Sequence, residues 1–390
     1  MQIEREDEMN KIPYGKQCIT EEDIARVVEV LRSELITQGE VLPEFERTVA
    51  EYHGAKYGVA FANGTAALHA AYYALGTCPG DEVISSPITF AASVNGGLYC
   101  GATPRFVDMD PSTNCLDVNK LRDAITDKTK VITPVSYAGY PVDLKAIHEI
   151  AQEKGCHIIH DACHALGSRR DGTFGMEYVD MAILSFHPVK HVTTGDGGMV
   201  LTNSDELNEK LRLFRTHGIT RDPARLRKND GPWYYEMQEL GYNYRLTDFQ
   251  AALGLSQFAR LKENLAARNA IAARYHEELK DCSFFELPPH LGFDAEGDTV
   301  HSYHLFTIRC CSAEVRKALH AYLRENKIYA QIHYVPLHLH PYYMDNFGFK
   351  EGDCPEAEAF YTGEISLPMY HSMTAEEQGF VIDTIKKFKI

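Results

Sequence analysis

Short runs of apolar and β-branched residues alternate with helical stretches through the first half of the sequence. In order they are YGVAFAN, TAALHAAYYALG, DEVISSP, TPRFVDMD, LDVNKLRDAI, KVITPVSY, DLKAIHEIAQEK, CHIIHDA, MAILSFH and GGMVLTN. Alternation of strand and helix predicts a largely parallel sheet with helices on both of its faces. We therefore place the chain in the α/β class, and its 390 residues with 44% apolar content are enough to bury a large core.

Two further patterns predict the domain organisation. GYNYRLTDFQAALGLSQFARLKENLAARNAIAARYHEEL has apolar residues every three or four positions, which predicts one long helix that bridges two domains. Beyond it, HLFTIRC, AEVRKALHAYLREN, IYAQIHY and ISLPMY predict a smaller α/β unit. We expect a large domain with an N-terminal arm over residues 1–260 and a small C-terminal domain over residues 261–390. In the arm, TEEDIARVVEVLRSEL predicts an amphipathic helix capped by Thr20.

The charge balance argues against several classes of partner. With 39 basic and 55 acidic residues, the net charge of −16 disfavours nucleic acid and anionic membranes. The first residues, MQIEREDEMNKIPYGKQ, have no apolar core, and no later run is long enough to span a bilayer. Ten scattered cysteines without a CxxC pair indicate neither a disulfide framework nor a zinc site. We expect a cytoplasmic protein without membrane or nucleic-acid partners.

Polar residues follow several predicted strands, where ligands bind in open parallel sheets. In FANGTAALHAA a strand ends, residues 63–66 form a turn and a helix begins, so free amides face any bound anion. In IIHDACHALG, Asp161 follows a buried strand and needs a cation or hydrogen-bond donors to stay ionised. Taken alone, the first pattern is common at strand–helix junctions, and the second is equally typical of a structural salt bridge.

A lysine and an aromatic residue occupy similar positions. In SFHPVKHVTTGDGG, Ser185 ends a strand and Lys190 follows in a loop, where most lysines are simply solvated. In SSPITFAAS, Phe90 comes just after a strand and is either part of the core or a surface on which a planar ring stacks. The HYVPLHLHPYY segment has His338 and His340 in alternation, but sugar contacts and packing explain this composition, and we expect no metal.

Together these features meet the requirements of pyridoxal 5'-phosphate. A helix start and Ser185 suit the phosphate, Asp161 suits the pyridinium nitrogen, Phe90 suits the ring face, and Lys190 can condense with the aldehyde. No competing small ligand that we considered uses all of these features. The sequence therefore predicts a pyridoxal-phosphate site, with Lys190 as its catalytic residue.

The segments GTAALHAA, DACHALGS, SFHPVKHVTTGDGG and ELGYNYRLTDFQAALGLSQ resemble the DegT/DnrJ/EryC1/StrS family of nucleotide-sugar aminotransferases, from about Tyr14 to the C-terminus. The resemblance implies fold type I of the pyridoxal-phosphate enzymes, the aspartate aminotransferase-like fold. It also implies a homodimer with shared active sites, because Asn243 matches an asparagine that reaches the cofactor phosphate of the neighbouring subunit. A dehydratase branch has histidine at the lysine position, so Lys190 favours amino transfer.

The resemblance carries over to individual positions. It assigns Lys190 to catalysis, and it assigns cofactor binding to Thr65, Ala66, Phe90, Asp161, His164, Ser185 and Asn243. It assigns binding of the sugar nucleotide to Tyr14, Thr37, Gly64, His333 and Tyr334.

The resemblance also implies a reaction. IPYGKQCIT, ITQGEVLPEFE and AQIHYVPLH are most similar to enzymes that aminate C4 of UDP-4-keto-6-deoxy-N-acetyl-L-altrosamine, in pseudaminic acid biosynthesis, with L-glutamate as donor. Two alternatives stay open. One is the same chemistry on another keto nucleotide sugar, and the other is a sensor that binds the cofactor without turnover.

Overall fold

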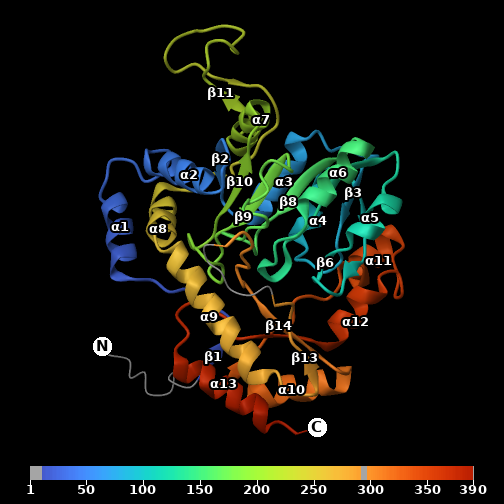
Figure 1. Ribbon diagram of the computed structural model, residues 1–390. Coiled ribbons are helices and arrows are strands. Elements are labelled where there is room, and N and C mark those ends of the chain that lie inside the picture. Colours follow the sequence, from blue (N-terminus) through green and yellow to red (C-terminus); the bar gives the residue numbers. More distant parts are fainter. Residues whose placement is uncertain (1–10, 291–296, 390) are drawn as a thin grey trace.

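A seven-stranded sheet forms the centre of the larger part of the molecule in the computed structural model, which describes residues 11–290 and 297–389 (Figure 1). Across the sheet the strands are β2 (Tyr57–Phe61), β10 (Gly198–Thr202), β9 (Met181–Ser185), β8 (His157–Asp161), β7 (Thr129–Thr133), β3 (Glu82–Ser85) and β4 (Thr103–Phe106). β10 is antiparallel to both of its neighbours, whereas every neighbouring pair from β9 to β4 is parallel. The predicted α/β class with a largely parallel sheet is confirmed.

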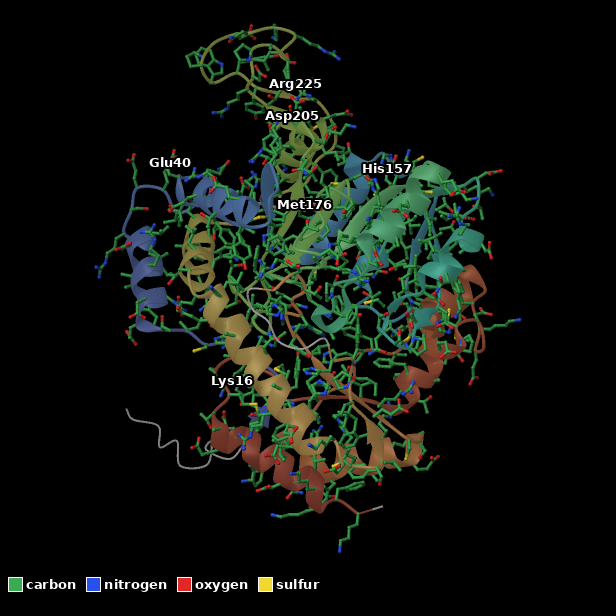
Figure 2. All side chains as sticks on the ribbon, viewed as in Figure 1. Lys16, Glu40, His157, Met176, Asp205 and Arg225 are labelled. Carbon is green, nitrogen blue, oxygen red and sulfur yellow. The ribbon has the colours of Figure 1, made fainter. Side chains whose placement is uncertain are left out.

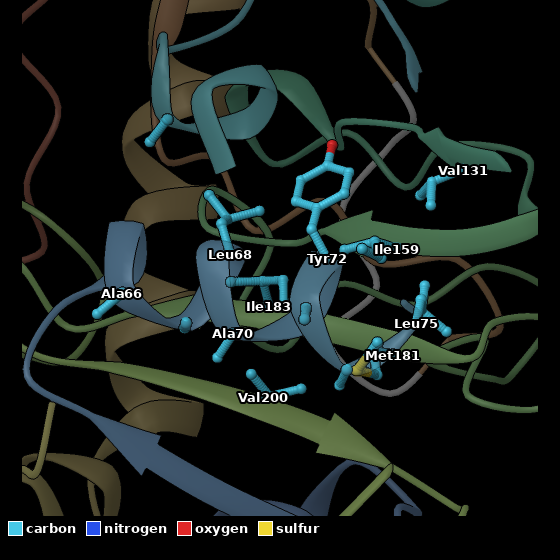
Figure 3. Close-up of a cluster of buried hydrophobic side chains, with 14 of the residues drawn as sticks. Ala66, Leu68, Ala70, Tyr72, Leu75, Val131, Ile159, Met181, Ile183 and Val200 are labelled. Atoms are coloured by element: carbon cyan, nitrogen blue, oxygen red, sulfur yellow. The ribbon is translucent and has the colours of Figure 1, made fainter. Parts of the chain in front are cut away.

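Helices cover the sheet and provide its core. They are α2 (Val41–Tyr52), α3 (Gly64–Ala74), α4 (Ala92–Tyr99), α5 (Val118–Ala124), α6 (Leu144–Lys154) and α7 (Asp205–Arg215). Figure 3 shows Leu68 and Tyr72 of α3 over Ile159, Ile183 and Val200 of three neighbouring strands. All five side chains are buried, and β9 and β10 are nearly continuous apolar runs, as expected of strands covered on both faces.

The arm helix α1 (Glu21–Leu31) begins as predicted. Thr20 caps it and forms a capping box with Asp23. The Asp23 carboxylate is fully buried, and it accepts hydrogen bonds from Ser256, Gln257 and Arg260. This buried ion pair fastens α1 to the segment around residue 260.

The prediction of one long bridging helix is wrong. Two helices, α8 (Asp248–Phe258) and α9 (Leu261–Leu279), are separated at residues 259–260, and residues 241–247 are not helical. Thr247 starts α8 with a capping box, while Asn243 forms a β-bridge with Thr216. The break lets α8 pack on α1 and α2 while α9 packs on α13 (Ala375–Lys387) (Figure 1). The spacing of apolar residues along the chain does not show that the two helices pack on different partners.

The second unit has its own hydrophobic cluster. Its three-stranded antiparallel sheet comprises β13 (Phe285–Glu286), β14 (Phe306–Cys310) and β16 (Glu364–Leu367), and α9, α10 (Ala313–Glu325) and α13 pack against it. β1 (Ile12–Pro13) pairs with β15 (Ile328–Tyr329), and Ile12 is buried in this same cluster. The boundary at residue 260 stays a prediction, but the start of the arm packs with the second unit.

Smaller elements complete the described chain. They are β5 (Met109–Asp110), β6 (Cys115–Leu116), β11 (Ile219–Thr220), β12 (Glu236–Met237), α11 (Pro341–Phe347) and α12 (Pro355–Gly363), with short 3-10 turns at residues 137–139 and 337–339. Figure 2 shows Arg225 on the loop that projects beyond α7, whose first residue is Asp205. None of the helices in the described ranges is long and apolar enough to cross a membrane.

Candidate active site

A cavity of about 280 Å³ lies where β8 and β9 end and α3 begins. Strand ends of this kind are where open parallel sheets bind ligands. Ten of the residues predicted from the sequence line the cavity: Tyr14, Gly64, Thr65, Phe90, Asp161, His164, Ser185, Lys190, His333 and Tyr334. The fold thus brings together residues that are up to 320 positions apart in the chain, from Tyr14 to Tyr334.

One end of the cavity is suited to an anion. The first-turn amides of Gly64 and Thr65 have no carbonyl within α3 to bind, and Ser185 lies beside them at the end of β9. A Cβ built on Gly64 would lie 3.5 Å from the Ser185 hydroxyl oxygen. β10 passes so close beneath this turn that a Cβ on Gly198 would lie 2.6 Å from the Asn63 backbone. A helix start, a hydroxyl and a close backbone approach form a phosphate cradle.

Asp161 is held by donors rather than by a salt bridge. Its carboxylate is buried, and it accepts a hydrogen bond of 2.5 Å from the Ser93 hydroxyl and one of 3.0 Å from the Cys163 amide. No ion pair to Asp161 is found within the described ranges. The structural salt bridge considered from the sequence is therefore not the explanation of this residue, and the carboxylate faces the cavity.

Lys190 lies in the same cavity with an altered proton affinity. Burial lowers the pKa of its amine from 10.5 to about 8, and the Arg268 guanidinium acts in the same direction, while Cys163 and Asp161 act against it. Nζ lies 3.3 Å from Nε2 of His304. Near neutral pH, an appreciable fraction of this amine is uncharged and can accept a proton or attack a carbonyl carbon.

Aromatic side chains form the walls of the cavity between the phosphate cradle and the Asp161 carboxylate. Phe90 is 59% exposed, and its ring centroid lies 6.1 Å from that of Tyr334. The Tyr334 hydroxyl lies 3.2 Å from Nε2 of His164, whose buried Nδ1 has no partner among the described residues. Burial lowers the pKa of His164 well below its usual value, so the ring is neutral. This arrangement leaves room for a planar ring and one unused polar atom to contact it.

His333 is supported from the second unit. Its amide donates to Glu364 and its Nδ1 lies 2.8 Å from the Ser366 hydroxyl, while the Tyr137 hydroxyl donates to its carbonyl. Burial raises the pKa of the Glu364 carboxyl to about 8. The hydrogen bonds to Glu364, Ser366 and Tyr137 thus hold His333 in place in the absence of substrate.

Three of the residues predicted from the sequence do not line the cavity. The Ala66 amide is already bonded to the Asn63 side chain at 2.8 Å, which is a helix cap. Thr37 and Asn243 are both exposed. Their assignments to substrate and cofactor stay predictions, and for Asn243 the predicted contact lies in a second subunit.

Sequence reasoning missed several residues that contact the site. Ser93 binds Asp161, Asn63 caps α3 beside Thr65, and His304 contacts Lys190. Asn63 carries a signal, because asparagine before a helix is a strong N-cap. Ser93 is 68 positions from Asp161 and His304 is 114 from Lys190, so no local pattern connects them.

The residues present fit pyridoxal 5'-phosphate. The cradle suits a phosphate, the cavity-facing carboxylate suits a protonated ring nitrogen, and the unpartnered Nδ1 of His164 is available to a ring substituent. Within the described residues, no group of three or more histidine, cysteine or acidic side chains could hold a metal ion. His338 is instead bonded to Glu358 at 2.8 Å.

Known proteins are similar to this chain over nearly its whole length. The model of the DegT/DnrJ/EryC1/StrS aminotransferase family matches residues 17–386. The chain is 36% identical to the spore coat polysaccharide biosynthesis protein SpsC of Bacillus subtilis, over 96% of each chain. It is 34% identical to the UDP-4-amino-4,6-dideoxy-N-acetyl-beta-L-altrosamine transaminase of Campylobacter jejuni, again over 96% of each.

Solved structures are similar over nearly the whole chain. PseC from Helicobacter pylori, an aminotransferase of pseudaminic acid biosynthesis, superposes with a TM-score of 0.88 at 30% identity, over 97% of this chain and 98% of that one. Spr1654 from Streptococcus pneumoniae in its pyridoxamine phosphate form superposes with a TM-score of 0.89 at 33% identity, over 96% and 98%. The same protein is also known in a pyridoxal phosphate form.

Proposed function

This chain belongs to the DegT/DnrJ/EryC1/StrS aminotransferase family, and from that premise we propose that it transfers the amino group of L-glutamate to C4 of a UDP-4-keto-6-deoxy-N-acetylhexosamine. The chain is a sugar aminotransferase that depends on pyridoxal phosphate. Beyond this, we propose the identity of the sugar, the amino donor and the role of each site residue. The assignment of residue roles rests on one observation above all, that Lys190, Asp161 and the phosphate cradle face a single cavity.

The cofactor contributes chemistry that no side chain has. Pyridoxal phosphate, when bound, supplies an electron-withdrawing ring that stabilises negative charge on a carbon after its proton is removed. Gly64, Thr65 and Ser185 would hold the phosphate, and Asp161 would keep the ring nitrogen protonated. Ser93 would fix the Asp161 carboxylate through its hydrogen bond.

Lys190 would move the proton in both halves of the reaction. Its uncharged Nζ would take the proton from Cα of the amino donor in the first half of the reaction and would deliver a proton to C4 of the sugar in the second half. Since burial brings the pKa of this amine to about 8, it exchanges protons readily near neutral pH. The walls formed by Tyr334 and His333 would keep bulk water from the reacting atoms.

The proposed sugar rests on relatives rather than on contacts seen in this chain. The C. jejuni relative acts on an N-acetylaltrosamine nucleotide, and PseC belongs to pseudaminic acid biosynthesis. Tyr14, Gly64, His333 and Tyr334 line the cavity, and we place the sugar against them. We also propose a homodimer in which Asn243 completes the partner's phosphate site.

An absorbance scan tests the proposal. The purified protein with pyridoxal phosphate should show a visible band that fades with L-glutamate and returns on addition of UDP-4-keto-6-deoxy-L-N-acetylaltrosamine. After borohydride reduction, mass spectrometry should find the cofactor attached to Lys190. Lys190→Ala should lack both the band and turnover, whereas Lys145→Ala, a change on α6 outside this cavity, should keep both.

The other outcomes separate the alternatives. A band that returns only with a different keto-sugar would retain the amino transfer and replace the substrate. A band that ignores glutamate and every keto-sugar would favour a sensor. Absence of any band in the wild type would contradict the assignment of Lys190.

A further inference from the structure

One side chain within hydrogen-bonding distance of the Lys190 amine belongs to a residue with no role so far. Nε2 of His304 lies 3.3 Å from Nζ of Lys190, although His304 belongs to the segment just before β14 in the second unit. The imidazole is 4% exposed. The contact therefore joins the catalytic loop of the central sheet to the second unit.

The backbone next to His304 adopts a strained conformation at Tyr303. Tyr303 has φ of +44°, a conformation that a bulky residue rarely adopts. Its amide donates to Nδ1 of His301 at 2.9 Å, and the His301 and Tyr303 rings stack at 3.8 Å. Strained residues of this kind persist only where the surroundings fix them, and they gather at functional sites.

A buried arginine holds the strained segment in place. Arg268 of α9 is fully buried, and its Nη1 donates to the carbonyls of Tyr303, His304 and Met369. Its Nε and Nη2 have no partner among the described residues. A buried guanidinium that binds only carbonyls is costly to keep, so the position of the segment that it holds matters to this protein.

The imidazole itself is a neutral hydrogen-bonding group. Burial and the neighbouring Lys190 keep the pKa of His304 well below its usual value. Its Nδ1 has no partner in the described chain, so Nε2 is the only nitrogen that makes a contact. A neutral ring nitrogen can accept one N–H of the Lys190 amine and leave the amine lone pair free to face the cavity.

We propose that His304 is a positioning residue for Lys190, which orients the amine toward the aldehyde of the cofactor by accepting a hydrogen bond at Nε2. This inference rests on the proposed role of Lys190. It assigns a function to the strained turn at Tyr303 and to Arg268, which set the angle of the imidazole.

Capture of the cofactor by the apo-enzyme tests this role without turnover. In this step Nζ of Lys190 bonds to the aldehyde carbon, and the aldehyde oxygen leaves as water. The rate of appearance of the visible band is measured at pH 9.5, above the pKa of about 8, so that most of the amine is uncharged. Binding of pyridoxine 5'-phosphate, which has no aldehyde, is measured in parallel.

Three variants make the comparison. His304→Phe keeps a ring but no acceptor, and His304→Gln keeps an acceptor at a similar reach. We expect His304→Phe to slow capture by about tenfold or more, because a small misplacement of a reacting atom has effects of this size. Pyridoxine 5'-phosphate should still bind it within about twofold. His304→Gln should recover most of the rate, and the control His276→Phe, outside the cavity, should match the wild type.

Each other result overturns the inference. Capture by His304→Phe at the wild-type rate would show that the contact has no effect. Weakened binding of pyridoxine 5'-phosphate by His304→Phe would show that His304 only packs against the site. A glutamine variant no faster than the phenylalanine variant would show the same. If the wild type itself forms no band, both the proposed function and this inference fail. A wild type that forms the band, with variants that behave otherwise than expected, contradicts the role of His304 alone.

Discussion

The Ser93 hydroxyl donates a hydrogen bond of 2.5 Å to Oδ2 of Asp161, and both groups are buried at the base of the cavity. Ser93 lies in the first turn of α4, and Tyr72 of α3 donates to its carbonyl at 2.7 Å. The helix layer thus fixes the carboxylate that is predicted to bind the cofactor ring.

We expect Ser93→Ala to weaken pyridoxal phosphate binding by about tenfold, since a hydrogen bond to a charged group contributes about 1.5–3 kcal/mol. Equilibrium dialysis with fluorescence detection measures the affinity. Ser85→Ala is the matched control, because that buried hydroxyl donates to the Thr133 carbonyl and does not touch Asp161. Equal losses in the two variants would contradict a specific role for Ser93.

Glu364→Gln should change how stability depends on pH. The folded pKa of this fully buried carboxyl is about 8 against 4.5 in the unfolded chain. Between those values the unfolded state releases the proton and the folded state keeps it, so stability falls as the pH rises from 4.5 to 8. Glutamine is neutral at every pH and removes this loss, which is on the order of 2–4 kcal/mol at pH 8.

Urea unfolding at pH 5 and pH 8 measures this effect. The difference in unfolding free energy between the two pH values should be smaller in Glu364→Gln than in the wild type. The exposed Glu286→Gln should leave that difference unchanged. A Glu364→Gln protein with the full wild-type pH dependence would show that this carboxyl is already ionised in the folded state.

Gly198→Ala should disturb the phosphate cradle from beneath. The added Cβ would lie 2.6 Å from the Asn63 backbone and 2.7 Å from Cα of Gly64, both of which are main-chain atoms. We expect a loss of about 1–3 kcal/mol in unfolding free energy and weaker binding of pyridoxine 5'-phosphate. In the control Gly379→Ala, the nearest atom is the end of the flexible Arg274 side chain. Unchanged phosphate binding in Gly198→Ala would argue against the cradle.

Mixed dimers test the predicted role of Asn243. Lys190→Ala and Asn243→Ala should each be poorly active alone. If each site takes Lys190 from one subunit and Asn243 from the other, refolding an equal mixture should restore about a quarter of wild-type turnover, because half of the dimers carry one intact site. A mixture no more active than its components would mean that the two residues do not serve sites shared in this way.

Local patterns in the sequence were enough for much of this description. The alternation of strands and helices predicted the sheet, because burial imposes its period on neighbouring residues. Asp161 and Ser185 could be recognised because each ends an apolar strand, and strand ends converge at one edge of a parallel sheet. Lys190 follows Ser185 closely enough to share that edge.

Tertiary packing decided the rest. The break between α8 and α9 follows from their different packing partners, and Ser93 and His304 meet Asp161 and Lys190 across 68 and 114 positions. The sequence by itself determined the class of fold and the residues at the strand ends, because those depend on near neighbours in the chain. Only the tertiary structure decided which distant side chains contact them, because such contacts arise when whole elements pack together and leave no periodic trace along the chain.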